Sequence, residues 1–168
     1  KKGLKVGIAE CRSLGGTCTN RGCIPAKTYV ESINLFTRIR NASRFGIEVG
    51  PPAISLAALA KRKDRIVSRL VKGIELLLKT NAVDIYPHTA AITAADTVKI
   101  GERSIQTANL LIAAGSVPKA VPFSAPGLLT SDEVFALEEA PASLAIIGGG
   151  VIGCEMAHIF SALGAKVP

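Results

Sequence analysis

The pattern Gly-x-Gly-x-x-Gly, formed by Gly148, Gly150 and Gly153, constrains the fold of this chain more than any other feature. It follows an apolar run at 144–147 and opens a helical pattern at 151–163, the context in which it indicates a dinucleotide-binding strand–loop–helix unit. The first glycine allows a tight turn, the second lets a pyrophosphate approach the backbone, and the third lets the helix pack on the strand. The phosphates would lie at the helix N-terminus, where free N–H groups favour anions. An ordinary glycine-rich turn is the alternative.

The rest of the chain alternates short apolar runs with helical patterns, which predicts an α/β fold with a parallel sheet. Helices are expected at 25–40, where Pro25 suits the first turn, and from Ser55, a candidate cap, to Lys79. The segment between Cys11 and Cys23 is expected to be a loop. Further expected elements are apolar strands at 4–10, 110–113 and 144–147, a small β-meander with strands at 83–86, 97–100 and 105–107, and a short helix at 131–137.

A linker with three prolines follows residue 117 and marks a candidate domain boundary, so residues 1–117 and 118–168 are expected to belong to two domains. Glu10 ends the first expected strand, which is where dinucleotide-binding units place the acid that binds the coenzyme ribose. The glycine-rich loop of the same unit would lie about twenty residues upstream, before the chain starts. We therefore expect a fragment that lacks the first βα unit. A surface glutamate is the alternative for Glu10. The matching acid of the second unit would lie where the chain stops, so NAD and NADP are not distinguished.

Two cysteines, Cys18 and Cys23, lie in a segment dense in glycine and threonine. A disulfide between them would close a small ring and stabilise the fold by only about 2 kcal/mol on the loop-length model. A role in redox chemistry therefore explains such a disulfide better than a role in stability. Cys23 precedes the expected helix start at Pro25, where free N–H groups and the helix dipole favour a thiolate. Lys27 places a cation in the first turn, where helix electrostatics disfavour it, and so suggests an anionic or electron-rich neighbour.

A zinc site and a pair of inert buried thiols are the alternatives to a redox role for these cysteines. Cysteine is among the residue types most often buried, which supports the inert thiols. His158 lies one helical turn after Cys154 and is expected to pack rather than to bind a metal. Zinc takes about four ligands, and the remaining candidates are scattered without a second paired spacing: Cys11, Cys154, His88 and His158.

Composition excludes several classes of protein. A chain of 168 residues that is 48% hydrophobic and has only four cysteines can build a core and is not a disulfide-stapled secreted scaffold. No run of about eighteen apolar residues occurs, so no membrane-spanning helix is expected. The net charge of +7 includes a basic helix face at 61–72, but no aromatic residues interleave with it. We interpret this face as solvated and do not expect nucleic-acid binding.

The segment from Gly15 to Lys27, Gly-Gly-Thr-Cys-Thr-Asn-Arg-Gly-Cys-Ile-Pro-Ala-Lys, resembles the redox-active disulfide motif of the flavin-dependent pyridine nucleotide–disulfide oxidoreductases. The order of the other elements is similar to that family: a long helix, a small meander, a strand at 112–116 like the family's Ala-Thr-Gly segment, and a second glycine fingerprint that leads into Glu155. The resemblance covers essentially the whole chain. Within the family it is strongest to the branch that oxidises dihydrolipoamide, on the segments 20–25, 72–77 and 143–153.

The resemblance implies an enzyme with a Rossmann-like FAD/NAD(P)-binding fold that uses FAD and NAD. A reduced dithiol, dihydrolipoamide on the lipoyl domain of a 2-oxo acid dehydrogenase complex, would attack a disulfide between Cys18 and Cys23. Cys18 would exchange with the substrate and Cys23 would face the flavin. Lys27 would lie near the flavin ring and pair with Glu155. The other residues implied to bind the two cofactors are Glu10, Gly16, Thr17, Gly115, Gly148, Gly150 and Gly153, and no metal is implied.

The family also implies a homodimer, in the cytoplasm or the mitochondrial matrix. Its catalytic His–Glu pair would lie in a C-terminal domain, so the resemblance implies a fragment that lacks the C-terminal half. Neither His88 nor His158 matches that pair. In the segment Ala113-Ala114-Gly115, Ala114 stands where the family usually has threonine, which removes one hydroxyl near the flavin. The rival within the family is a glutathione-, mercuric- or trypanothione-type reductase, and Val151, where glutathione reductases tend to have a gating tyrosine, favours the dehydrogenase. A non-catalytic folded piece is the rival from another class.

Overall fold

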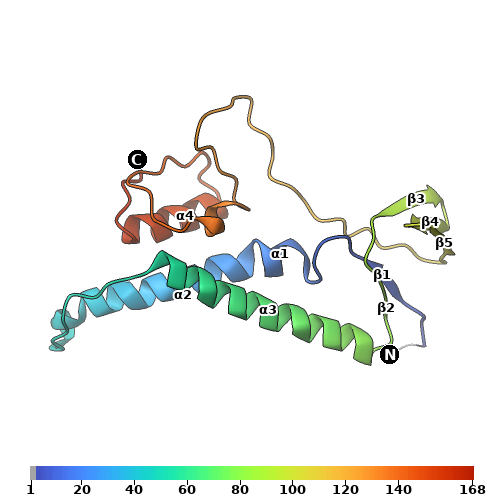
Figure 1. The fold of residues 1–168 in the computed structure, drawn as a ribbon, viewed down its shortest axis with the longest axis horizontal. Coiled ribbons are helices and arrows are strands. Elements are labelled where there is room, and N and C mark those ends of the chain that lie inside the picture. Colours follow the sequence, from blue (N-terminus) through green and yellow to red (C-terminus); the bar gives the residue numbers. More distant parts are fainter. Residues whose placement is uncertain (1–2) are drawn as a thin grey trace. The chain divides into compact units, whose positions relative to one another are not determined.

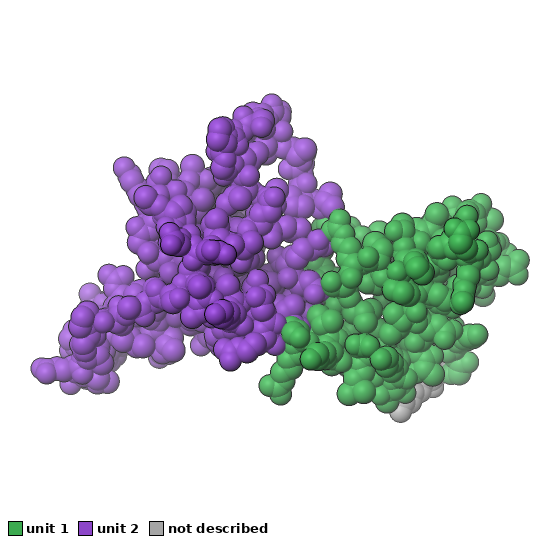
Figure 2. All heavy atoms as spheres, viewed as in Figure 1, with its two compact units in different colours: residues 1–17, 68–116 green, residues 18–67, 117–168 purple. Residues whose placement is uncertain are grey.

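The computed structural model describes residues 3–168, which form two compact units (Figures 1 and 2). One unit consists of residues 3–17 and 68–116, drawn in green in Figure 2. The other consists of residues 18–67 and 117–168, drawn in purple. The first unit contains the β-strands, and the second contains most of the helices and the largest buried cluster.

A parallel strand pair lies in the first unit. Strand β1 (Gly7–Ala9) pairs with β2 (Asp84–Tyr86), and Gly7 lies opposite Asp84. The strand expected at 83–86 therefore exists, but it pairs with β1 instead of joining the meander. The expected strand at 4–10 is confirmed over its central residues.

The meander of the first unit consists of β3 (Ala90–Ala94), β4 (Thr97–Ile100) and β5 (Arg103–Gln106), paired antiparallel in that order. Gly101 in the two-residue turn between β4 and β5 has φ +58°, as the favoured tight hairpin turns require. The prediction missed β3, because its sequence is rich in alanine and poor in the β-branched and aromatic residues that mark strands.

Helices build the second unit. Helix α2 (Cys23–Arg40) packs against α4 (Val151–Ala162), and a short 3₁₀ helix η1 (Ala42–Phe45) follows α2 and ends at Gly46. The expected helix at 131–137 is present only as one turn of 3₁₀ helix, η2 (Val134–Ala136). The buried cluster of this unit is mainly aliphatic and aromatic: Ala26, Tyr29, Ile33, Leu56, Leu59, Val134, Phe135, Met156, Ile159, Phe160 and Ala165.

Two helices run across the division between the units. Helix α3 (Leu56–Thr80) matches its predicted range, and its predicted cap is confirmed because the Ala58 N–H donates to Ser55 Oγ at 3.2 Å. Helix α1 (Gly16–Asn20) lies in the segment that was expected to be a loop. Helix α2 likewise begins at Cys23 instead of Pro25, because a proline is tolerated throughout the first turn, where N–H groups have no helical acceptor.

Two predicted strands are wrong. Residues 110–113 and 144–147 form no ladder, and Leu111 and Ile147 are 89% and 71% exposed. Around the second segment, the described residues form only a single parallel bridge, between Ser143 and Lys166. An apolar strand of a parallel sheet is stable when paired strands flank it and layers cover both faces. The described part of the chain supplies neither for these runs.

Candidate active site

The two cysteines of the glycine-rich segment lie on different helices. Cys18 belongs to α1, and Cys23 is the first residue of α2. Both are exposed free thiols. Interaction with the Cys23 side chain, with partial desolvation, raises the pKa of Cys18 above its ordinary value. The structure therefore brings together the two sulfurs that the sequence motif pairs.

The start of α2 also acts on the Cys18 sulfur. The Cys23 backbone N–H precedes the first helical hydrogen bond, from Ala26 N–H to the Gly22 carbonyl. Interaction with the Cys23 backbone opposes the increase in the pKa of Cys18, as does the positive charge of Lys27. The expected effect of the helix start on Cys23 stays a prediction.

The ion pair implied by the family resemblance is present. The Lys27 ammonium group on α2 donates to Glu155 Oε1 on α4. This hydrogen bond raises the pKa of Lys27, although partial desolvation of the lysine opposes the shift. A cation in the first turn of α2 is thus compensated by a carboxylate, in agreement with the prediction that Lys27 has an anionic neighbour.

Two further polar contacts of this unit were not predicted. Arg21, between the two cysteines, forms an ion pair with Asp132, with Nη1 and Oδ2 3.5 Å apart. His158 on α4 is exposed, and its Nε2 atom lies 3.1 Å from Asn34 Oδ1 on α2, so it forms a hydrogen bond where packing was expected. The only sequence signal for the first contact was the position of Arg21 between the two cysteines. The sequence did not identify Asp132 or Asn34 as the partners.

The second glycine fingerprint forms the turn into α4. Gly148 has φ +112°, and an added β-carbon at Gly148, Gly149 or Gly150 would meet open space. A β-carbon at Gly153 would overlap the backbone carbonyl of Gly148, so only glycine fits there. The loop thus leaves room at the N-terminus of a twelve-residue helix, where backbone N–H groups can receive a phosphate. These features fit the pyrophosphate of a dinucleotide.

The remaining residues predicted to bind cofactor lie in or next to the first unit. Glu10 follows β1 and accepts a hydrogen bond from the Arg12 N–H at 2.7 Å. Gly115 has φ +76°, and the position of its missing β-carbon is 3.7 Å from Thr17 Oγ1, so these two predicted residues are neighbours. Gly16 begins α1 with φ +63°. The side chain of Glu10 and the open backbone at Gly115 fit the ribose and the backbone contacts expected for FAD.

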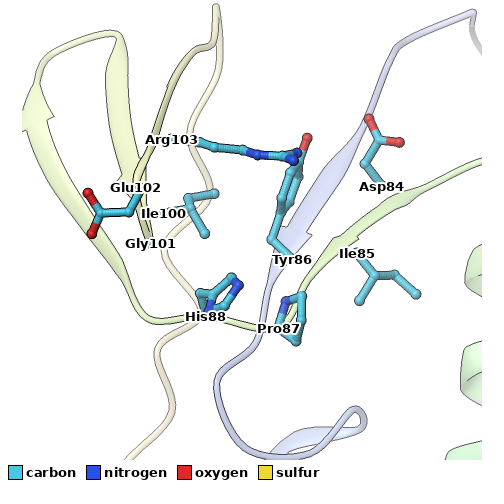
Figure 3. Close-up of a pocket in the computed structure, with 9 residues that line it drawn as sticks. All are labelled: Asp84, Ile85, Tyr86, Pro87, His88, Ile100, Gly101, Glu102 and Arg103. Atoms are coloured by element: carbon cyan, nitrogen blue, oxygen red, sulfur yellow. The ribbon is translucent and has the colours of Figure 1, made fainter.

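A pocket of about 850 Å³ lies elsewhere in the first unit (Figure 3). Its lining comes from β2, the residues after it and the hairpin between β4 and β5, and it includes His88 and Arg103. None of the predicted site residues lines it. Among residues 3–168, no group of three or more histidine, cysteine or acidic side chains is placed to hold a metal ion. No helix in that range is both long enough and apolar enough to cross a membrane.

The profile of one protein family, the pyridine nucleotide-disulphide oxidoreductases, matches residues 1–168. The chain belongs to this family. The chain is 41% identical over 173 residues to the dihydrolipoyl dehydrogenase of Chlamydia trachomatis and 39% identical over 176 residues to that of Bacillus subtilis. These alignments cover 98% and 99% of the chain but 37% and 38% of the relatives. The chain therefore spans little more than a third of their length.

The fold is also similar to that of a solved relative. The crystal structure of LpdA from Mycobacterium tuberculosis superposes with a TM-score of 0.88, at 22% identity, over 99% of this chain and 38% of that one. The predicted α/β fold class and the predicted family membership are thus confirmed.

Proposed function

We propose that the chain carries the dithiol–disulfide centre, and parts of the two dinucleotide sites, of an FAD- and NAD-dependent enzyme that oxidises dihydrolipoamide. The placement of Cys18 on α1 and of Cys23 at the first residue of α2, both as exposed thiols, is the observation that carries this proposal. The names of the relatives at 39% to 41% identity support the choice of substrate within the family.

The cofactors are assigned to the residues that fit them. Glu10, Gly16, Thr17 and Gly115 would hold FAD, and the Gly148–Gly153 turn would hold the pyrophosphate of NAD. When bound, the flavin accepts the electron pair of the reduced sulfurs and delivers it to the nicotinamide as a hydride. The protein supplies the placement of the sulfurs and of the charges near them.

The two cysteines would take turns as electrophile and leaving group. A substrate thiolate attacks Cys18 Sγ of the disulfide, the S–S bond breaks, and Cys23 leaves as a thiolate. The second substrate thiol then attacks the mixed disulfide and releases Cys18, so the substrate leaves as a disulfide. The two protein sulfurs have gained two electrons, and two protons have left the substrate thiols. The free N–H donors at the start of α2 stabilise the anionic sulfur.

Lys27 and Glu155 would set the charge beside these sulfurs. The Lys27 charge acts on Cys18 through space, and Glu155 fixes the position of that charge. We also propose that residues 1–117 belong to the FAD domain and residues 118–168 to the NAD domain. The complete protein would be a homodimer of the cytoplasm or mitochondrial matrix and would act on lipoyl domains of 2-oxo acid dehydrogenase complexes.

Cysteine variants of the full-length protein that contains this chain test the proposal. Cys18→Ser and Cys23→Ser should each reduce NAD-dependent oxidation of dihydrolipoamide to background, because the protein disulfide can no longer form. Cys11→Ser removes an exposed thiol outside the pair and should keep the activity. Activity that survives either change in the pair, or a wild type that reduces glutathione disulfide or mercuric ion but leaves dihydrolipoamide untouched, would overturn the proposal.

A further inference from the structure

The segment from Cys18 to Lys27 contains two cations, Arg21 and Lys27, and each is paired with a carboxylate from the later part of the same unit. Arg21 lies between the two cysteines, three residues after the first and two before the second. Its guanidinium is 3.5 Å from Asp132, and the two side chains are only 32% and 27% exposed. The pair is therefore largely shielded, and neither charge is freely solvated.

The two cations differ in what they do to the thiols. Interaction with the Cys23 side chain raises the pKa of Cys18, and the charge that opposes this increase is that of Lys27. Lys27 lies nine residues from Cys18 in the sequence, whereas Arg21 lies three residues away. An arginine so close in sequence would favour a thiolate if its guanidinium faced the sulfurs. The guanidinium is instead paired with Asp132, and Arg21 is not among the groups that shift the pKa of Cys18.

We propose that Asp132 is a positioning residue that holds the Arg21 guanidinium away from the two sulfurs. This inference rests on the proposed function of Cys18 and Cys23. Without Asp132, the guanidinium can turn toward the sulfurs and stabilise their thiolate form. A more stable thiolate is a better leaving group and a weaker nucleophile, so the balance between opening and closing of the disulfide would change.

Asp132→Asn in the full-length protein tests this role. The cysteines are first reduced, and the rate at which Cys18 and Cys23 react with neutral iodoacetamide is followed by mass spectrometry as a function of pH. A freed surface charge of this kind is worth up to about 1 kcal/mol, so the variant should react about threefold faster near neutral pH. An alkylation profile equal to that of the wild type would overturn the proposal.

The double variant distinguishes two causes of a change: movement of the Arg21 charge toward the sulfurs, and loss of the ion pair as a structural contact. If Arg21 causes the change, Arg21→Gln combined with Asp132→Asn should restore the wild-type profile, and Arg21→Gln alone should have little effect. The inference would be contradicted if the alkylation profile changed equally in both single variants, or if the double variant kept the change seen in Asp132→Asn. Either result would assign the ion pair a purely structural role. Asp132→Glu keeps the carboxylate and should behave like the wild type.

Two controls complete the experiment. Glu48→Gln removes one exposed negative charge of the same unit and should leave the profile unchanged. Lipoamide should close the reduced wild-type pair, taking two electrons and two protons from the two thiols and leaving as dihydrolipoamide. A wild type that fails to close overturns the proposed function and this role together. A wild type that closes, with Asp132→Asn unchanged, overturns this role alone.

Discussion

Lys27 on α2 and Glu155 on α4 form an ion pair across 128 residues of sequence. The pair joins the helix that begins at the second redox cysteine to the helix that begins at the glycine fingerprint. The charge of Lys27 is therefore fixed by a residue that lies two positions after Gly153 of that fingerprint.

Glu155→Gln should lower the pKa of Lys27 back toward its ordinary value of 10.5, because the hydrogen bond to the carboxylate is the main cause of the increase. A lysine whose pKa is raised by folding stabilises the folded state below its unfolded pKa, and this contribution is lost as the pH rises through the folded value. The wild type should therefore be more stable than Glu155→Gln near neutral pH, and the difference should vanish in strong alkali. Guanidinium unfolding at both pH values measures it.

A contrasting pair is available as a control. Glu75 has a lowered pKa because of its hydrogen bond to Lys79, so its contribution is present above the ordinary carboxyl value of 4.5 and disappears as the pH falls through the lower folded value. Glu75→Gln should thus lose its effect in acid. A Glu155→Gln difference that persisted unchanged in strong alkali would contradict the assignment to Lys27.

Gly153→Ala should destabilise the protein, because the new methyl group would overlap the backbone carbonyl of Gly148, which cannot move aside as a side chain could. Overpacking of this kind typically costs about 1–3 kcal/mol of unfolding free energy. Gly149→Ala is the matched control, because a β-carbon there meets open space. Chemical denaturation of the two variants compares them. Equal stability would show that the turn relaxes around the methyl group.

Tyr29→Phe should leave the stability near neutral pH unchanged or slightly higher. The Tyr29 hydroxyl is buried, and none of the described groups forms a hydrogen bond with it. Removing an unpartnered buried hydroxyl avoids the cost of its desolvation, roughly 1–3 kcal/mol at most. The ring contact with Phe135, at 5.1 Å between centroids, is kept. A substantial loss of stability in this variant would reveal a partner for the hydroxyl.

The pH dependence of the same variant gives a second readout. Burial, with a smaller contribution from Asp64, raises the pKa of Tyr29 from 10.0 to about 12. A tyrosine whose pKa is raised stabilises the folded state below its unfolded value, and that stability is lost as the pH rises from 10.0 toward about 12. The wild type should therefore lose more stability across this range than Tyr29→Phe, as measured by thermal unfolding. Parallel losses would contradict the assignment.

Helices were predicted better than strands, for a physical reason. Helix α3 has local hydrogen bonds, a cap at Ser55 and a regular apolar period, so its range follows from nearby residues alone. The apolar runs at 110–113 and 144–147 have the composition of buried strands, but a strand needs a partner elsewhere in the chain. No described segment pairs with the first run, and a single bridge flanks the second.

In the candidate site, features set by neighbouring residues were predicted from the sequence, whereas contacts between distant residues were not. The proximity of Cys18 and Cys23 and the fit of Gly153 follow from local spacing. The pairing of Lys27 with Glu155 was implied only by the resemblance to a family, because no local pattern relates residues so far apart. The contact between Arg21 and Asp132 was missed for the same reason, and it depends on how η2 and α2 pack in the folded unit.

The attachment of Glu155 to Lys27 has a thermodynamic corollary. A ligand that loosens this ion pair when it occupies the glycine turn would change the charge felt by Cys18. Linkage is reciprocal, so the protonation of the thiols would alter the affinity for that ligand by the same factor. Ligand binding at the turn and ionisation of the thiols would then form one coupled equilibrium. A titration of the thiols would report on ligand binding, and a titration with the ligand would report on the ionisation of the thiols.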